Sequence, residues 1–185
     1  REEQDADAIL VNTCSVRDQA EQKALGKMGM MGKHREKRGH VVYGFMGCMA
    51  QSRGEELFDR VPHLDLVVGT QKYHRVFGYV DDILHRRQEE RMDDPSMALE
   101  GHTVEEGSSS PAPGEGRLVD TGLEKDSQNT IRDHVVAGKQ ATAFVSIMQG
   151  CNMNCAFCIV PKTRGSERYR VMDEICDEIK STVKN

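Results

Sequence analysis

Short apolar runs alternate with longer amphipathic stretches through the first 91 residues. Apolar runs that end at turn residues predict buried strands, and apolar positions three or four residues apart predict helices. The predicted strands span 8–13, 40–46 and 64–68, and the predicted helices span 15–32, 54–60 and 71–87. This alternation indicates a parallel sheet covered by helices. We therefore expect a doubly wound α/β domain, Rossmann-like or flavodoxin-like, over residues 1–91.

The first two strands are each followed by a cysteine. Ser15 is the expected N-cap of the first helix, with Asp18 three residues on, and 47–51 is expected to be a loop. Cys14 and Cys48 come directly after the first and second predicted strands. Ligands of parallel sheets gather at the carboxyl ends of the strands. We expect these two cysteines to lie near each other at that edge.

The periodic pattern stops after residue 91. Residues 92–140 are predicted to be a flexible acidic linker, because the Gly, Ser, Pro and Glu of GSSSPAPGEG offer too few apolar groups to offset the entropy of ordering. A structureless loop of this length inside one compact domain would be unusual, so a domain boundary is placed here. The segment 141–185 then starts a second domain, with a strand at 142–148 and a helix at 171–183. One strand and one helix cannot enclose a core, so we expect them to be the first βα unit of a larger barrel.

Charge and composition narrow the class of protein only a little. The net charge of −5 arises in the middle of the chain, where residues 92–137 hold ten acidic and three basic residues. Residues 1–91 hold fifteen of each sign, so the overall acidity does not exclude a nucleic-acid partner. No apolar run is long enough to span a membrane, and the sequence lacks a secretory signal pattern. A cytoplasmic protein is expected, in which clustered cysteines are more often metal-binding or catalytic than disulfide-bonded.

Three of the six cysteines lie within eight residues, as Cys151, Cys155 and Cys158. A structural zinc site would need a fourth ligand, usually from a second closely spaced pair, and none follows. Cys176 is eighteen residues further on inside the predicted helix, and we expect it to be a buried thiol. Three thiolates suit an iron–sulfur cluster with one iron left open to a substrate. Cysteines spaced C-x3-C-x2-C after a strand are typical of the radical S-adenosylmethionine superfamily.

The resemblance extends to four separate motifs in one order. These are 12–21 (NTCSVRDQAE), 47–51 (GCMAQ), 68–70 (VGT) and 146–165 (SIMQGCNMNCAFCIVPKTRG). Together they resemble the tRNA methylthiotransferases, and Ser-Val-Arg-Asp after Asn-Thr-Cys resembles the branch that acts on isopentenyladenosine. Sister enzymes act on threonylcarbamoyladenosine of tRNA or on a ribosomal protein. A non-enzymatic module that binds zinc or an iron–sulfur cluster is the other alternative.

The resemblance implies two [4Fe–4S] clusters and S-adenosylmethionine as cofactors. Cys151, Cys155 and Cys158 would hold the radical cluster, with Gly150 and Phe157 beside the cofactor. Gly150 is also expected to let the loop turn tightly toward the cluster. Cys14 and Cys48 would hold an auxiliary cluster, whose third cysteine is expected before residue 1. One S-adenosylmethionine would supply the methyl group and a second the radical that attacks C2 of the adenine. The implied partners are tRNA and a reductant protein such as flavodoxin or ferredoxin. The protein itself is expected to be a monomer. The 185 residues alone are expected to be inactive.

Basic side chains follow the cysteine loop. Lys162, Arg164, Arg168 and Arg170 could face tRNA phosphates or could form a solvated surface, and the sequence does not decide between these. The basic stretch 33–38 is expected to be a solvated loop.

Overall fold

A four-stranded parallel sheet organises the larger part of the molecule. The computed structural model describes residues 6–15, 17–33, 35, 39–92, 116–124 and 142–184. The strand order is β1-β2-β3-β4, with all neighbours parallel. The strands are β1 (Ala8–Thr13), β2 (Val42–Gly47), β3 (Leu66–Val68) and β4 (Leu118–Asp120). Their carboxyl ends therefore meet at one edge of the sheet.

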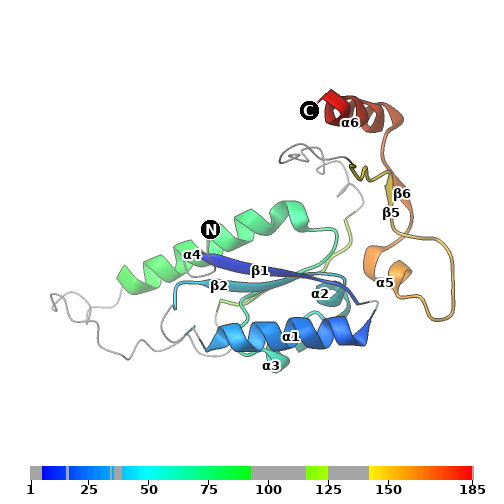
Figure 1. Cartoon of the computed structure of the whole chain (residues 1–185). Coiled ribbons are helices and arrows are strands. Elements are labelled where there is room, and N and C mark those ends of the chain that lie inside the picture. The colour runs from blue at the N-terminus through cyan, green and yellow to red at the C-terminus, as the bar shows by residue number, and fades with distance from the viewer. Residues whose placement is uncertain are drawn as a thin grey trace.

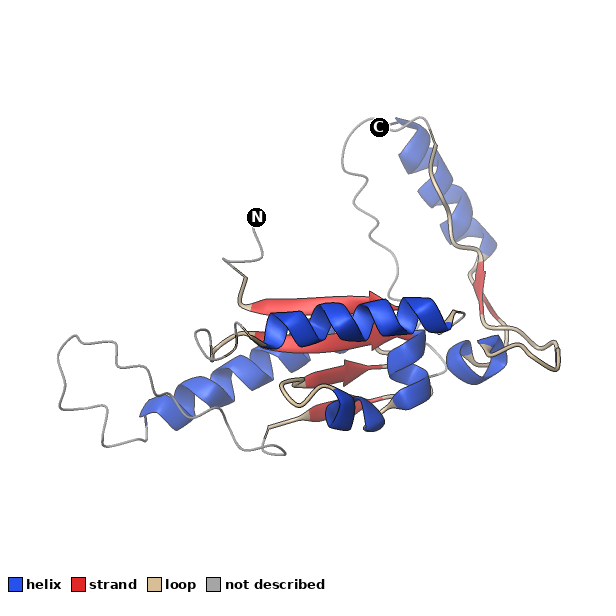
Figure 2. Cartoon of the chain, turned by 60° about the horizontal axis from the view of Figure 1, so that its bottom comes forward, coloured by secondary structure: helices blue, strands red, loops and turns tan. Residues whose placement is uncertain are grey.

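Helices cover both faces of this sheet (Figures 1 and 2). The helical elements of this unit are α1 (Asp18–Gly32), α2 (Cys48–Arg53), α3 (Glu56–Arg60), η2 (Tyr73–Arg75) and α4 (Val76–Met92). In Figure 1, α4 lies on one side of the strands, and α1 and α3 lie on the other. The predicted doubly wound α/β arrangement is confirmed.

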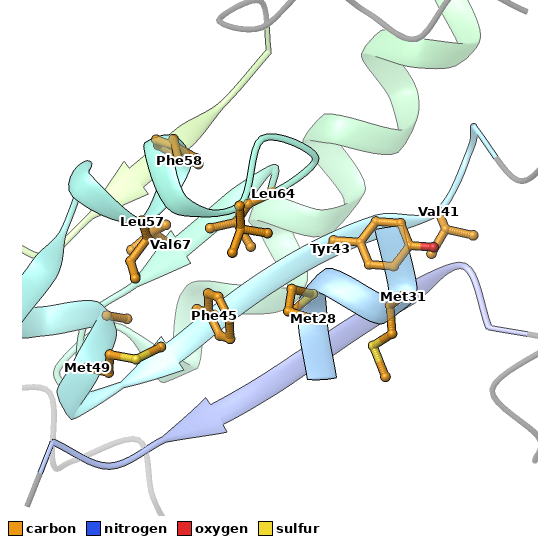
Figure 3. Packing of buried hydrophobic residues seen from close by; sticks show 12 residues of the cluster. Met28, Met31, Val41, Tyr43, Phe45, Met49, Leu57, Phe58, Leu64 and Val67 are labelled. Atoms are coloured by element: carbon orange, nitrogen blue, oxygen red, sulfur yellow. The ribbon is translucent and has the colours of Figure 1, made fainter. Parts of the chain in front are cut away.

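Alternate side chains of each strand enter two separate cores. On one face, Phe45 and Val67 pack with Met28 of α1 and Leu57 of α3, as Figure 3 shows. On the other face, Val42, Leu66 and Val68 pack with Val76, Val80 and Ile83 of α4. Because strand side chains alternate between faces, runs such as Val-Tyr-Gly-Phe must be apolar throughout to satisfy both cores. This requirement explains why the central strands were detectable as continuous apolar runs.

Two boundaries near the cysteines differ from the prediction. The first helix begins at Asp18, with Arg17 rather than Ser15 at its N-cap, because the chain needs several residues to turn from the sheet edge onto the face. The segment 47–51 was predicted to be a loop, but α2 begins at Cys48 directly after β2. Gly47 makes this turn at φ +102°. The first helical residue is therefore itself one of the predicted ligands.

The fourth strand was not foreseen. Residues 118–120 were predicted to lie in the linker, yet they pair with β3 through Leu66–Leu118, Val67–Val119 and Val68–Asp120. A three-residue strand between polar segments has too short a pattern to detect, and it forms because β3 offers an unpaired edge. Most of the remaining predicted linker lies outside the described residues, and the division at 91 and 141 stays a prediction.

The carboxyl-terminal part has a small hairpin in place of the predicted long strand. Its elements are β5 (Met148–Gln149), α5 (Val160–Arg164), β6 (Arg168–Tyr169) and α6 (Met172–Lys184). Residues 142–147 are not in a strand, and β5 pairs antiparallel with β6 over two residues. A strand needs a hydrogen-bonding neighbour, and the described residues supply only this short one. The helix at the end is confirmed, whereas the barrel stays a prediction.

None of the described helices is both long and apolar enough to cross a membrane.

A buried carboxylate joins the two helical layers to the sheet. Asp65, only 6% exposed, accepts two hydrogen bonds from Arg35 at 2.7 and 3.0 Å and a third from the Tyr43 amide at 2.9 Å. Arg87 of α4 donates to the same carboxylate and, at 3.0 Å, to the Val41 carbonyl. Burial lowers the pKa of the Arg87 guanidinium, and the negative charge of Asp65 opposes that shift. The carboxylate thus compensates one buried guanidinium group, that of Arg35, and one half-buried group, that of Arg87. Arg35 was predicted to lie in a solvated loop, and its burial against Asp65 corrects that prediction.

We expect Asp65→Asn to lower the free energy of unfolding by about 3–5 kcal/mol, because the buried Arg35 and the half-buried Arg87 would lose their counter-charge while the side-chain shape is kept. Urea denaturation measures the change. Asp82→Asn on the exposed surface of α4 is the matched control and should change stability by no more than about 0.5 kcal/mol. Equal stabilities of the two variants would contradict the role assigned to Asp65.

Candidate functional site

Two predicted ligands occupy neighbouring positions at the carboxyl edge of the sheet. Thr13 and Gly47 are register partners at the ends of β1 and β2, and Cys14 and Cys48 are the next residue of each chain segment. The two strand ends that precede the cysteines are therefore adjacent, whereas a shared ligand between Cys14 and Cys48 stays a prediction. Cys14 is exposed, whereas Cys48 is buried at the start of α2. Neither is in a disulfide.

A tyrosine contacts the end of β1 just before Cys14. The Tyr73 hydroxyl donates to the Asn12 side-chain carbonyl at 3.4 Å, two residues before Cys14. Burial raises the pKa of Tyr73 to about 12, the charge of Cys48 adds to the rise, and Arg164 opposes it. Tyr73 is consequently within electrostatic reach of a residue from each of the two cysteine-bearing regions.

The loop with the other three cysteines is closed at its base by backbone contacts. The Cys151 amide donates to the Gly165 carbonyl at 3.1 Å, and the Cys158 amide donates to the Cys155 carbonyl at 3.1 Å. Gly150 has φ +86°, and a Cβ there would lie 2.1 Å from the Ser166 carbonyl oxygen. The tight turn predicted at Gly150 is confirmed. No residue with a side chain fits this position without moving the backbone.

A reciprocal pair of side chains also supports the loop. The Asn152 amide and side chain both donate to the Glu167 carboxylate at 3.3 Å, and the Glu167 amide donates to the Asn152 side-chain oxygen at 3.0 Å. The Tyr169 hydroxyl donates to Glu167 at 2.6 Å and is the main reason that the pKa of this carboxyl is lowered. This pair was not predicted from the sequence, where the position of Asn152 directly after Cys151 is the one local signal for it.

The three thiols of the loop are suitable ligands for an iron–sulfur cluster, although they are not grouped around one metal position in this structure. Cys155 and Cys158 are exposed, Cys151 is half-buried, and all three are free thiols. Within the described ranges, no three His, Cys, Asp or Glu side chains are arranged to hold a metal ion. Three accessible sulfurs on one loop remain the donor set that such a cluster requires. Phe157, predicted to lie beside the cofactor, is 96% exposed.

The two cysteine regions are joined through short helices. Helix α5, which begins two residues after Cys158, contacts α2, which begins at Cys48. Thr70 Oγ1 donates to the Thr163 carbonyl at 2.6 Å, and Gln71 Nε2 donates to the Arg164 carbonyl at 3.3 Å. These two side chains thus satisfy carbonyls at the end of α5 that have no helical partner.

Two of the four basic residues after the cysteine loop have internal partners. Arg168 donates to the Glu124 carbonyl at 2.7 Å, and Arg170 forms an ion pair of 2.6 Å with Glu178 of α6. These contacts disfavour a phosphate-binding role for both. Lys162 and Arg164 are exposed. Cys176, predicted to be a buried thiol, is half-buried, because the apolar face of α6 that includes Ile179 and Val183 is exposed.

We expect Gly150→Ala to open the base of the cysteine loop, because the added Cβ collides with the Ser166 carbonyl and the positive φ costs about 1–3 kcal/mol. Exchange of the Cys151 amide hydrogen should accelerate correspondingly. Gly26→Ala in α1, where a Cβ meets nothing within 4 Å, is the control and should leave that rate unchanged. An unaltered Cys151 rate in Gly150→Ala would contradict the steric argument.

Comparisons with known proteins show what the chain is similar to. Residues 1–69 match a family model described as "Uncharacterized protein family UPF0004". A tRNA-2-methylthio-N(6)-dimethylallyladenosine synthase of Akkermansia muciniphila is 57% identical over 178 residues, which cover 96% of this chain and 36% of the relative. Proteins of the same name from Opitutus terrae and Methylacidiphilum infernorum are 45% and 42% identical, over 96% and 95% of this chain and 37% and 32% of their own lengths.

The chain therefore spans about a third of the length of these relatives. Residues 1–69 match the UPF0004 family model, and the chain is similar over nearly all its length to tRNA-2-methylthio-N(6)-dimethylallyladenosine synthases.

Proposed function

We propose that this chain is the cysteine-bearing part of a tRNA methylthiotransferase. The whole protein would transfer a methylthio group to C2 of N6-isopentenyladenosine beside the tRNA anticodon. The observation that carries the proposal is the joining of two cysteine regions by α2 and α5, in a chain whose relatives bear that enzyme's name. The reaction would take place in the cytoplasm, where tRNA and a flavodoxin or ferredoxin reductant are available.

In this proposal the cysteine loop binds the first cofactor. Cys151, Cys155 and Cys158 would hold a [4Fe–4S] cluster through three irons, which leaves the fourth iron to S-adenosylmethionine. Bound there, the cluster and S-adenosylmethionine would supply the radical chemistry that an unactivated C–H bond requires. The chain's own contribution is to hold the loop closed, through Gly150 and the Asn152–Glu167 pair. The exposed Phe157 ring is available to pack against the cofactor.

The second cofactor would be bound at the sheet edge. Cys14 and Cys48 supply two thiolates from neighbouring strand ends, and the whole protein must supply a third. Burial of Cys48 restricts water at this edge, and the exposed Cys14 leaves one side open. This asymmetry suits a cluster that passes sulfur to a substrate in front of it. Lys162 and Arg164, exposed on α5, are two basic side chains that could contact tRNA phosphates.

Iron content tests the two ligand sets. The whole protein, reconstituted without oxygen, should bind about eight irons as two four-iron clusters. Cys14→Ala and Cys48→Ala should each lower the content toward about four, because an auxiliary ligand is lost. Cys176→Ala is the matched control and should leave it unchanged. A content near four that Cys14→Ala and Cys48→Ala do not alter would exclude the auxiliary cluster.

Nucleoside analysis tests the reaction and the substrate. A strain without this gene should accumulate N6-isopentenyladenosine in its tRNA and lack the 2-methylthio derivative. The wild-type gene and Cys176→Ala should restore the derivative, whereas Cys155→Ala should not, because radical formation needs all three loop thiolates. Loss of methylthio groups from threonylcarbamoyladenosine alone would indicate the sister activity. Unchanged tRNA with zinc bound to the purified protein would support the non-enzymatic module.

A further inference from the structure

The segment 69–73 follows β3 and contains no cysteine, yet it contacts each of the three regions that carry the predicted ligands. It includes the end of the Val-Gly-Thr motif at 68–70, for which the proposed chemistry has no use. Gly69 begins the segment, Thr70 and Gln71 are buried, and Tyr73 ends it. Its contacts therefore need an explanation other than metal binding.

Two contacts join the segment to helix α2, which begins at Cys48, and to the end of β1 before Cys14. The Thr70 amide donates to Gln51 Oε1 at 3.2 Å, in the same helix as Cys48. The Gln51 side chain packs closely against Gly69, because a Cβ at position 69 would lie only 2.1 Å from Gln51 Oε1. The Tyr73 hydroxyl donates to the side chain of Asn12, two residues before Cys14. A side chain at position 69 would thus displace the glutamine that fixes α2 to the segment.

Two further contacts join the segment to the cysteine loop. Thr70 Oγ1 and Gln71 Nε2 donate to the last carbonyls of α5, those of Thr163 and Arg164. Helix α5 has five residues, far fewer than an isolated helix needs for stability in water. Its conformation therefore depends on being held from outside, and Thr163 is 1% exposed at this contact.

The loop after β4 fixes the other side of the segment. The Glu124 amide donates to Gln71 Oε1 at 2.5 Å, and the Glu124 carboxylate pairs with Lys72 at 3.0 Å. The Glu124 carbonyl accepts from Arg168 at 2.7 Å, just beyond α5. The ion pair with Lys72 is the main cause of the lowered pKa of Glu124. Segment 69–73 is consequently held by contacts with β1 and α2, with α5, and with Glu124 after β4.

We propose that segment 69–73 is a positioning element that sets the cysteine loop at 151–158 against the Cys14 and Cys48 strand ends. Thr70 is its central residue, because its amide binds the α2 side and its hydroxyl binds α5. The consequence for catalysis rests on the proposed function: the placement would keep the methylthio donor and the radical source directed at one adenine. The placement itself needs no cofactor and can be measured without iron.

Hydrogen exchange on the metal-free whole protein tests the placement. In Thr70→Val, the amides of Thr163 and Gly165 should exchange roughly five-fold faster, the factor expected when one hydrogen bond of ordinary strength is lost. Thr70→Ser keeps the hydroxyl and should restore the wild-type rate. Thr182→Val loses a hydroxyl that bonds only within α6, to the Glu178 carbonyl, and should leave α5 unaffected. Unchanged α5 exchange in Thr70→Val would overturn the proposal.

A product ratio on the reconstituted enzyme separates positioning from folding. Thr70→Val should keep its iron and its 5′-deoxyadenosine formation, while 5′-deoxyadenosine formed per methylthio product rises about five-fold. A parallel fall of iron, radical and product, with an unchanged ratio, would show only a structural role and overturn the positioning role. If Thr70→Val does not fold, Gln71→Leu serves with the same expectations. A wild-type protein that makes no methylthio product would refute the proposed function and leave the exchange result standing.

Discussion

The Asp65 carboxylate is the interaction on which the arrangement of the sheet and its two helical layers depends. It receives Arg35 from the connection after α1, Arg87 from α4 on the opposite face, and the Tyr43 amide of the central strand β2. Three charged groups in so small a volume are tolerated only because each hydrogen-bonds another. The Asp65 backbone continues the ladder on both sides, through the Tyr43 carbonyl and the Leu118 amide.

The Asp65 interactions lie at the amino end of β3. The candidate functional site lies at the opposite, carboxyl end of the strands. At that carboxyl edge, strand ends put Cys14 beside Cys48, and the β3–α4 connection contacts both regions. A parallel sheet divides its two edges in this way because every strand must return by a crossover on a face. The edge with the turns is then free to vary in sequence while both cores stay intact.

The sequence predicted the features that depend on local pattern. Apolar runs such as Val42–Gly47 must satisfy two cores, so they stand out without knowledge of the fold. Gly150 could be assigned a tight turn, since positive φ is almost confined to glycine. Ser15 was a poor guide to the start of α1, because the path of the chain from the sheet edge outweighed a good capping residue. β4 was not predicted because Leu118–Asp120 has no strand pattern of its own. These residues form a strand because they pair with the free edge of β3.

The sequence by itself determined the doubly wound alternation, the thiol spacing of the loop at Cys151–Cys158, and the placement of Cys14 and Cys48 after strands. These follow from side-chain chemistry at fixed intervals along the chain. Only the tertiary structure decided that Thr70 bonds the end of α5, that Glu124 faces Gln71, and that Arg168 and Arg170 have internal partners. Contacts between Thr70 and Thr163 span 93 residues, and a hydroxyl and a carbonyl carry no local sign of which partner they will meet.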